Sequence, residues 1–202
     1  MRILRKRGYI VKPDLDALRR MIGEKLPGRA AHILGCEKTA AKLARCWGED
    51  EEKARFAALL HDITKQYSHI EQLKFVQKYD ILVDSDFDRF PALAHAVTGA
   101  AVARAEYGAD EDVVHAIRYH TTGRPGMTKL EKILYLADYI EPSRDFKGLE
   151  ETRELAYRDL DAAVLRATAE CVIYNLKKSR PIHPITIAAY NDMVESAARS
   201  DN

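Results

Sequence analysis

Residues 50–62 of the chain read DEEKARFAALLHD, and this stretch indicates how the protein folds. Apolar residues recur in it at three- and four-residue spacing behind an aspartate that can cap a helix, so it predicts an amphipathic helix. The polar run at 64–66 places the helix end close to the adjacent pair His61-Asp62. Side chains at neighbouring helical positions lie about 100° apart, so one metal ion bound by both would have to lie off the flank of the helix near its end.

The same helical pattern runs through almost the whole sequence. Alternating β-branched runs are absent, and capping boxes are expected at Ser68/Glu71 and Thr128/Glu131, with further N-caps at Asp50 and Asp110. The sequence therefore predicts an all-α fold, a bundle of about eight or nine helices around a central metal site. The expected helices are 14–25, 29–47, 51–63, 69–79, 91–107, 111–120, 129–140, 152–178 and 185–199. The stretches 80–90, 121–127 and 142–151 break the pattern, and 84–88 is interpreted as a solvated loop.

The composition limits the classes of protein to be considered. A length of 202 residues predicts a short N-terminal extension at 1–12 and a single domain at 13–202. The net charge of +1 points to neither nucleic acid nor a membrane as a partner. No apolar run reaches the roughly 18 residues of a membrane span, and the start lacks the apolar core of a secretion signal, so the cytoplasm is the expected location. A homodimer is compatible with the sequence.

Several further residues could join the His61-Asp62 pair at a metal. His32, His95, His120 and Asp138 each lie inside or at the edge of an apolar helical segment, separated by enough chain for one or two helices and a turn. The ligands would then come from successive helices of a bundle. A carboxylate within the apolar segment ILYLADYI is costly to bury without a metal or a cation as its partner. This cost supports Asp138 as a metal ligand. His69 and His115 are instead interpreted as core histidines, and Cys36 and Cys46 as small buried thiols.

Imidazole and carboxylate donors together favour iron, manganese, cobalt, nickel or zinc over calcium or magnesium. The three cysteines show no CxxC spacing, which argues against a structural zinc site and against a disulfide framework. A metal held by such donors makes water available as a nucleophile and polarises a phosphoryl oxygen. Hydrolysis of a phosphate ester or anhydride is the reaction that this chemistry suits best. Six candidate ligands are compatible with one ion, or with two ions bridged by Asp62.

The pattern His32, His61-Asp62 and Asp138 resembles the signature of the HD superfamily of metal-dependent phosphohydrolases. More narrowly, LLHDITK, HAVTGA, YHTTGRPGMTKLEKILYLADYIEPSR and RPIHPITIAAYN are similar to the bacterial YqeK family of symmetrical diadenosine tetraphosphate hydrolases. This resemblance covers about residues 13–200. It implies an HD-domain helical bundle and cleavage of diadenosine tetraphosphate to two ADP. It also implies a divalent transition-metal cofactor. Iron is the metal expected, with manganese and cobalt as alternatives.

Carried over by motif, the resemblance implies roles for individual residues. The metal ligands would be His32, His61, Asp62 and Asp138. Asp62 would also accept the proton of the attacking water, and His95 and His120 would face the substrate or complete a second metal position, so these three are the catalytic candidates. The substrate contacts implied are Arg29, Lys65, His95, His120, Thr121, Thr122, Glu141 and Arg144, and the segment 177–183 is a further candidate for contact with the nucleotide.

Two alternatives stay open at this point. One is another HD phosphohydrolase, acting on nucleoside monophosphates, deoxynucleotides or guanosine alarmones, and the other is a non-catalytic nucleotide sensor that keeps the metal pocket. Symmetrical cleavage gives ADP alone, asymmetrical cleavage gives AMP and ATP, and a sensor binds without hydrolysis. For Arg29, Lys65 and Arg144, an ordinary surface charge is the alternative to a phosphate contact.

Overall fold

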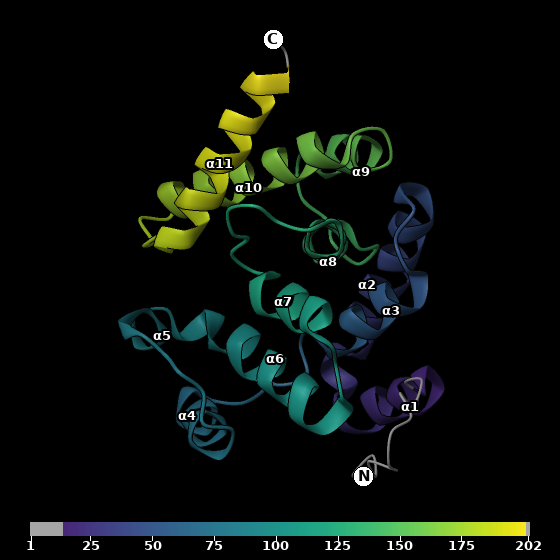
Figure 1. The fold of residues 1–202 in the computed structure, drawn as a ribbon, viewed down its shortest axis with the longest axis vertical. Coiled ribbons are helices and arrows are strands. Elements are labelled where there is room, and N and C mark those ends of the chain that lie inside the picture. The colour runs from purple at the N-terminus through teal and green to yellow at the C-terminus, as the bar shows by residue number, and fades with distance from the viewer. Residues whose placement is uncertain (1–13, 201–202) are drawn as a thin grey trace.

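A computed structural model describes residues 14–200, and the expected N-terminal extension at 1–12 lies outside the described residues. The helices in chain order are α1 (Leu15–Lys25), α2 (Pro27–Trp47), α3 (Glu51–Leu60), α4 (His69–Lys78), α5 (Ser85–Arg89), the 3₁₀ helix η1 (Pro91–Leu93), α6 (Ala94–Tyr107), α7 (Glu111–Tyr119), α8 (Lys129–Ile140), α9 (Leu149–Ala156), α10 (Leu160–Lys177) and α11 (Pro184–Ser200). The all-α prediction is confirmed, since residues 14–200 contain no strand (Figure 1). The helices in this range outnumber the eight or nine expected.

The helices begin where the sequence provides a cap. Ser68 and Thr128 each accept from the backbone N–H three residues on, while Glu71 and Glu131 accept from the backbone N–H of the capping residue, so both predicted capping boxes are confirmed. Asp50 caps α3 and Asp110 caps α7 in the same way, through an aspartate oxygen.

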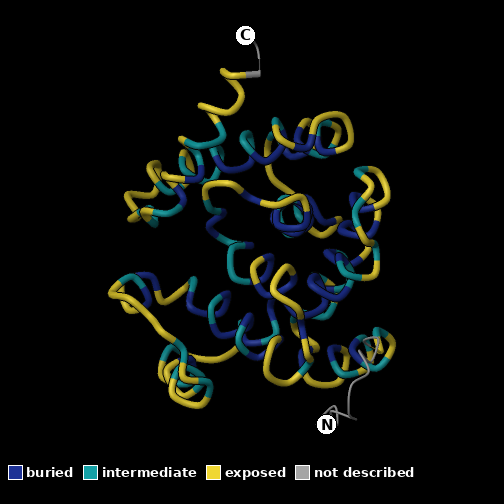
Figure 2. Tube along the Cα trace, in the orientation of Figure 1, coloured by how far each residue is buried: buried dark blue, intermediate teal, exposed yellow. Residues whose placement is uncertain are grey.

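The centre of the molecule is built from helices with small residues on their facing sides. Ala40, Ala44, Ala57 and Ala58 are completely buried where α2 packs against α3. Alanines let two helix axes approach closely, since the separation of packed helices depends on the side chains at the contact. Helix α8 lies against α2, α3 and α7 and appears end-on in Figure 1, and Figure 2 shows it as one of the most completely buried segments. This close packing brings polar residues of α2, α3 and α8 toward one point.

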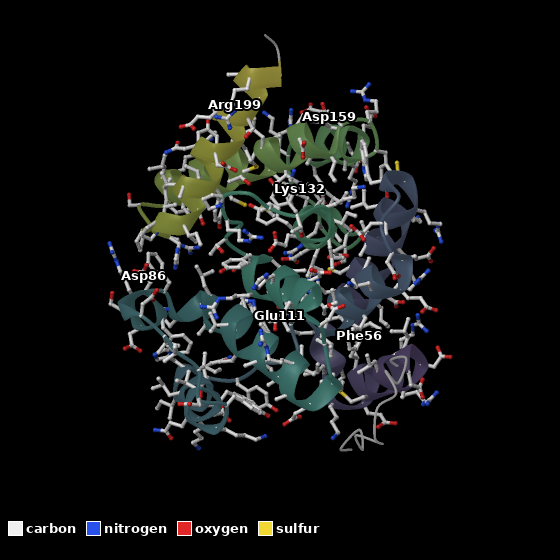
Figure 3. All side chains as sticks on the ribbon, in the orientation of Figure 1. Phe56, Asp86, Glu111, Lys132, Asp159 and Arg199 are labelled. Atoms are coloured by element: carbon white, nitrogen blue, oxygen red, sulfur yellow. The ribbon has the colours of Figure 1, made fainter. Side chains whose placement is uncertain are left out.

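The long helix expected at 152–178 is in fact two helices. Helix α9 ends at Ala156, and α10 starts at Leu160 after Asp159, whose side chain accepts from the backbone N–H of Ala162. Figure 3 labels Asp159 at this break. The single-helix prediction was wrong because it took an aspartate with strong N-cap preference for an interior residue.

The region 80–90 also differs from the expectation. Residues 85–89 form the short helix α5, capped by Asp84, and Phe87 and the adjoining Phe90 are buried. The interpretation of 84–88 as a solvated loop was therefore wrong, because burial of the two phenylalanines holds an otherwise acidic segment against the protein. The helix expected at 91–107 is split into η1 and α6, and the helix expected at 51–63 ends at Leu60.

Two histidines that the sequence assigned to the core lie near the surface. His69 is partly exposed and its Nε2 lies 3.0 Å from Asp88 Oδ1, while the side chain of His115 is 46% exposed. The assignment was wrong for both: Val114 and Ala116 beside His115 are buried on another face of α7, whereas Ile70 beside His69 is itself exposed. None of the helices formed by residues 14–200 has the length and apolar character needed to cross a bilayer.

Candidate metal centre

The centre of the site is the turn that follows α3. After Leu60 the chain continues with i→i+3 bonds, Ile63 N–H to the Leu60 carbonyl at 3.1 Å and Lys65 N–H to the Asp62 carbonyl at 3.0 Å. This tighter winding places His61 and Asp62 at the helix end, as the sequence predicted, and brings the Nε2 of His61 to 3.5 Å from Asp62 Oδ2. Both side chains are buried.

A buried polar network fixes this turn to its neighbours. Thr64 Oγ1 donates to the His95 carbonyl at 3.0 Å, and Gln72 Nε2 donates to the Thr64 carbonyl at 2.6 Å. Thr64 and Gln72 are almost completely buried, so these bonds satisfy polar groups that would otherwise be costly to bury. The network ties the turn to α6 and α4, and thereby fixes His95 relative to the His61-Asp62 pair.

Four imidazole rings are held at their Nδ1 atoms by acceptors behind them. His61, His95 and His120 each bond through Nδ1 to the carbonyl three residues earlier, of Ala58 at 2.6 Å, Ala92 at 3.0 Å and Ile117 at 2.7 Å respectively. The Nδ1 of His32 lies 3.0 Å from Glu141 Oε1. A carbonyl can only accept, so Nδ1 of His61, His95 and His120 carries the proton and the Nε2 lone pair of each neutral ring is left free. His32 has a carboxylate at each ring nitrogen; burial would lower its pKa, but the hydrogen bonds to Asp138 and Glu141 outweigh burial and raise it.

The Nε2 atoms of the four rings face one another around Asp62. The Nε2 atoms of His32 and His61 are 3.3 Å apart, and those of His95 and His120 are also 3.3 Å apart. Asp62 lies between the two pairs, with Oδ2 3.5 Å from the Nε2 of both His32 and His61 and Oδ1 3.3 Å from His95 Nε2 and 3.8 Å from His120 Nε2. One carboxylate therefore presents one oxygen to each pair of imidazoles.

Asp138 completes the side of the centre that contains His32. Its Oδ1 lies 3.1 Å from His32 Nε2, and it comes from α8, whose apolar residues fill the core. Arg144 Nη2 donates to the same oxygen at 2.7 Å, and Arg29 forms an ion pair with Asp62. Each carboxylate of the centre is thus paired with one guanidinium group, as buried charges require.

The surroundings shift the pKa values of these groups in directions that suit metal ligands. Burial alone would raise the pKa of Asp62, but the neighbouring imidazoles, above all that of His61, outweigh it and hold this pKa well below its ordinary value. Burial lowers the pKa of His95, and burial with nearby imidazoles lowers the pKa of His120 to about 3. Asp62 is therefore ionised and these two rings are neutral at neutral pH, the protonation states in which both residue types bind metals.

The donors fit a divalent metal ion. The Nε2 atoms of His95 and His120 both carry lone pairs and cannot hydrogen-bond to each other, so their separation of 3.3 Å is favourable when a cation lies against both. Ligand atoms of His32, Cys36, His61 and Asp138 lie within 4.8 Å of one another, and so do those of His61, Asp62 and His120. Nitrogen and oxygen donors in this mixture match a transition metal better than calcium or magnesium.

The predicted substrate contacts surround the centre at different depths. The Nζ of Lys65 lies 3.2 Å from both ring nitrogens of His95, and burial lowers the pKa of Lys65. Thr121 and Thr122 follow His120 directly, and Thr122 Oγ1 donates to the Gly123 carbonyl at 2.9 Å. Their contacts with substrate, like those of Arg29 and Arg144, stay predictions.

Glu141 has a local role that the sequence did not indicate. It is only 1% exposed, and besides bonding to His32 it accepts from the backbone N–H of Ser143 at 2.7 Å. The carboxylate is thus fixed at the C-terminal end of α8 and orients the His32 ring from behind. A nucleotide contact through Glu141 stays a prediction.

Cys36 also lies at the centre. Its Sγ is 3.6 Å from His32 Nε2 and the residue is completely buried. The interpretation as a buried thiol is confirmed for Cys36, although its proximity to the predicted ligands was missed. The available signal was the four-residue spacing from His32, which places both on one face of α2. The interpretation was wrong for Cys46, which is exposed near the C-terminal end of α2.

Comparison with known proteins agrees with this geometry. A family model described as the HD domain matches residues 29–143, which include all six residues of the centre predicted from sequence. The chain belongs to the HD-domain family. This confirms the resemblance seen in the sequence, and membership of the HD-domain family implies binding of a divalent metal, which the donor set fits.

Curated relatives that carry the name symmetrical bis(5'-nucleosyl)-tetraphosphatase are similar to this chain along most of its length. The relative from Bacillus subtilis is 41% identical, and the match covers 84% of this chain and 91% of the relative. The relative from Halalkalibacterium halodurans is 43% identical, and the match covers 82% of this chain and 89% of the relative. A solved structure from Clostridium acetobutylicum, described as a predicted HD superfamily hydrolase involved in NAD metabolism, superimposes with a TM-score of 0.85. It is 37% identical and the match covers 90% of this chain and 97% of that one.

Proposed function

We propose that this HD-domain protein is a metal-dependent hydrolase that cleaves diadenosine tetraphosphate symmetrically into two ADP. The observation that carries the proposal is the set of four imidazoles locked with their Nε2 atoms toward Asp62, in a chain more than 40% identical to two symmetrical tetraphosphatases along most of their length. The likeness supports the substrate, and the donor set supports the chemistry of phosphoanhydride hydrolysis.

The metal in this proposal is iron, with manganese or cobalt as alternatives. The two oxygens of Asp62 face different pairs of imidazoles, which supports two ion positions rather than one. His32, His61 and Asp138 would hold the first ion with Asp62, and His95 and His120 would hold the second.

A divalent metal bound to these donors supplies positive charge that polarises a phosphoryl oxygen and lowers the pKa of water. The residues of the chain orient the substrate and handle the proton. Arg29 and Arg144, each bonded to a carboxylate of the centre, and Lys65 present positive charge to the polyphosphate. The low pKa of Asp62 keeps it ionised, which favours its role as a ligand over that of proton acceptor.

His95 and His120 are better placed to take up the proton in this scheme. Both rings are buried and neutral, and both direct an Nε2 lone pair into the centre. Each would act as a ligand or as a base, depending on whether the second metal position is filled.

The test is a substrate panel with purified protein loaded in turn with iron, manganese and cobalt. The panel contains dinucleoside polyphosphates, nucleoside monophosphates, deoxynucleotides and guanosine alarmones, and ion-exchange chromatography identifies the products. Preferential turnover of diadenosine tetraphosphate supports the proposal. Preferential turnover of a mononucleotide or an alarmone assigns the protein to another HD phosphohydrolase, and nucleotide binding without turnover assigns it to a sensor.

The expected cytoplasmic location and homodimer belong to the same proposal. Cell fractionation tests the first, and size-exclusion chromatography with light scattering tests the second.

A further inference from the structure

A cleft of about 480 Å³ lies between α6, α7 and the chain that follows α4. Figure 1 shows α6 and α7 side by side with α4 to their left, and the two helices pack against each other. None of the six residues predicted as metal ligands lines this cleft. Its size suits a whole small molecule, since ligand pockets begin at roughly 300 Å³.

The cleft lies on the faces of α6 and α7 that are turned away from the metal centre. Ala101 and Arg104 line it from α6, and at about 100° per residue they lie roughly 180° to 240° around the helix from His95. On α7, Arg118 lies about 160° from His120 on the same scale. A ligand in the cleft would therefore lie behind the two helices, apart from the metal.

Much of the lining is apolar. Small side chains of α6, among them Val97, Ala100 and Ala101, leave the space open, and the rings of Tyr79 and Tyr119 line it as well. A mostly apolar lining with a few polar groups is the usual composition of a small-molecule site. Such a lining favours a ligand with an organic body over a bare inorganic ion.

Positive charge gathers at the same cleft. Arg104, His115 and Arg118 line it together with one carboxylate, that of Asp80. The half-buried guanidinium of Arg118 forms no hydrogen bond or ion pair with any other described residue, and its carbon lies 6.0 Å from the centre of the Tyr119 ring. A guanidinium group has only N–H donors, so this one is suited to bind an anion.

Arg104 can serve the same ligand. It donates to Glu111 at 2.7 Å, but the two side chains are 53% and 63% exposed. An exposed ion pair of this kind contributes about 1 kcal/mol or less, so a ligand anion can replace Glu111 as the partner. Guanidinium groups bind phosphate oxygens through two parallel hydrogen bonds, which makes a phosphate group the anion that fits best.

We propose that this cleft is a second ligand site, outside the metal centre, for a nucleoside phosphate. Its phosphate would bind Arg104 and Arg118, and its ring system would lie against the apolar and aromatic lining, because every nucleobase has a π-face that can stack on an aromatic ring. The inference goes beyond the proposed function, since it concerns a ligand that is not held at the site of hydrolysis.

The experiment uses metal-free protein, so that no metal ion holds the ligand. The protein is titrated calorimetrically with ADP and with inorganic pyrophosphate. ADP should bind, and pyrophosphate should bind more weakly because it lacks the ring system. Arg104→Ala should weaken ADP binding about tenfold, the effect of losing a hydrogen bond between charged groups. Ala101→Phe, which fills part of the cleft, should weaken it at least as much.

Arg45→Ala is the matched control. Arg45 is 57% exposed and pairs with Glu51, as Arg104 pairs with Glu111, but it lies on α2 and does not line the cleft. This variant should bind ADP as the unmodified protein does. Arg104 is replaced rather than Arg118, because Arg118 also lines a separate cavity beside Thr121, a predicted substrate contact.

Thermal melting shows whether each variant is folded, and Arg104→Glu takes the place of Ala101→Phe if the latter does not fold. Unchanged ADP binding in both cleft variants would overturn the site. So would ADP binding that appears only after metal is added, or pyrophosphate that binds as tightly as ADP. Turnover by metal-loaded protein tests the proposed function separately. If no dinucleotide is hydrolysed while Arg104→Ala still weakens ADP binding, the proposed function fails and the second site stands.

Discussion

Replacing Glu141 by glutamine should weaken metal binding without unfolding the protein. Glu141 Oε1 lies 3.0 Å from His32 Nδ1, the carboxylate is only 1% exposed, and Ser143 holds it from the other side. Glutamine keeps the shape but loses the negative charge that orients the ring and increases its basicity. Loss of such an outer partner typically lowers metal affinity about tenfold to hundredfold, which corresponds to about 1.4 to 2.8 kcal/mol.

The assay is competition for manganese or cobalt with a chelator of known affinity, with thermal melting of each metal-free protein measured in parallel. Glu37→Gln is the matched control, because Glu37 is also buried and lies on α2 but pairs with Arg19 and Arg55 rather than with the centre. This variant should melt at a lower temperature and bind metal as the unmodified protein does. If Glu141→Gln binds metal within threefold of the unmodified protein, the orienting role assigned to Glu141 is wrong.

Three further predictions concern the same region. Asp62→Asn should abolish both metal binding and turnover, because one oxygen faces each imidazole pair; a metal-free variant with full activity would refute the assignment. Gly35→Ala should lower metal affinity despite the better helix propensity of alanine, since the added Cβ would lie 2.6 Å from Glu141 Oε2; Gly23→Ala, which meets open space, should leave the affinity unchanged. Burial by itself would raise the pKa of Glu37, but hydrogen bonds from Arg19 and Arg55 hold it below 4.5, so its stabilising effect is present above that pH and lost as pH falls through the lower folded value. Chemical denaturation should therefore find Glu37→Gln destabilised at pH 7 and closer to the unmodified protein at pH 3, whereas an equal difference at both pH values would contradict the ion pairs.

Much of the fold could be predicted because local signals and tertiary packing agree. The capping boxes at Ser68 and Thr128 start helices that the core then buries, so sequence pattern and structure coincide there. The predicted helix boundaries were wrong where tertiary packing overrode a local sequence signal or where such a signal was overlooked. In the sequence, Asp159 looks like one more polar residue of a long helical segment, although it caps α10. The acidic stretch around Phe87 has the composition of a solvated loop, although burial of the Phe87 ring holds it as the helix α5.

The site was predictable to the level of residue type and spacing. Histidine and aspartate at the ends of apolar helical segments indicate ligands, because such polar side chains are costly to bury without a metal or a charged partner. The features that fix these ligands could not be read from the chain. The carbonyls that bond His61, His95 and His120 belong to ordinary apolar residues, and the approach of Glu141 to His32 depends on how α8 lies against α2. Backbone acceptors and helix placement leave no pattern of residue types in a sequence.

The most direct test of the account is the product ratio from diadenosine tetraphosphate. Purified metal-loaded protein is incubated with this dinucleotide, and ADP, AMP and ATP are quantified together with the remaining substrate. The account predicts two ADP for each substrate molecule consumed, with no AMP or ATP, and no turnover after the metal is removed. Equal amounts of AMP and ATP, or undiminished turnover without metal, would contradict it.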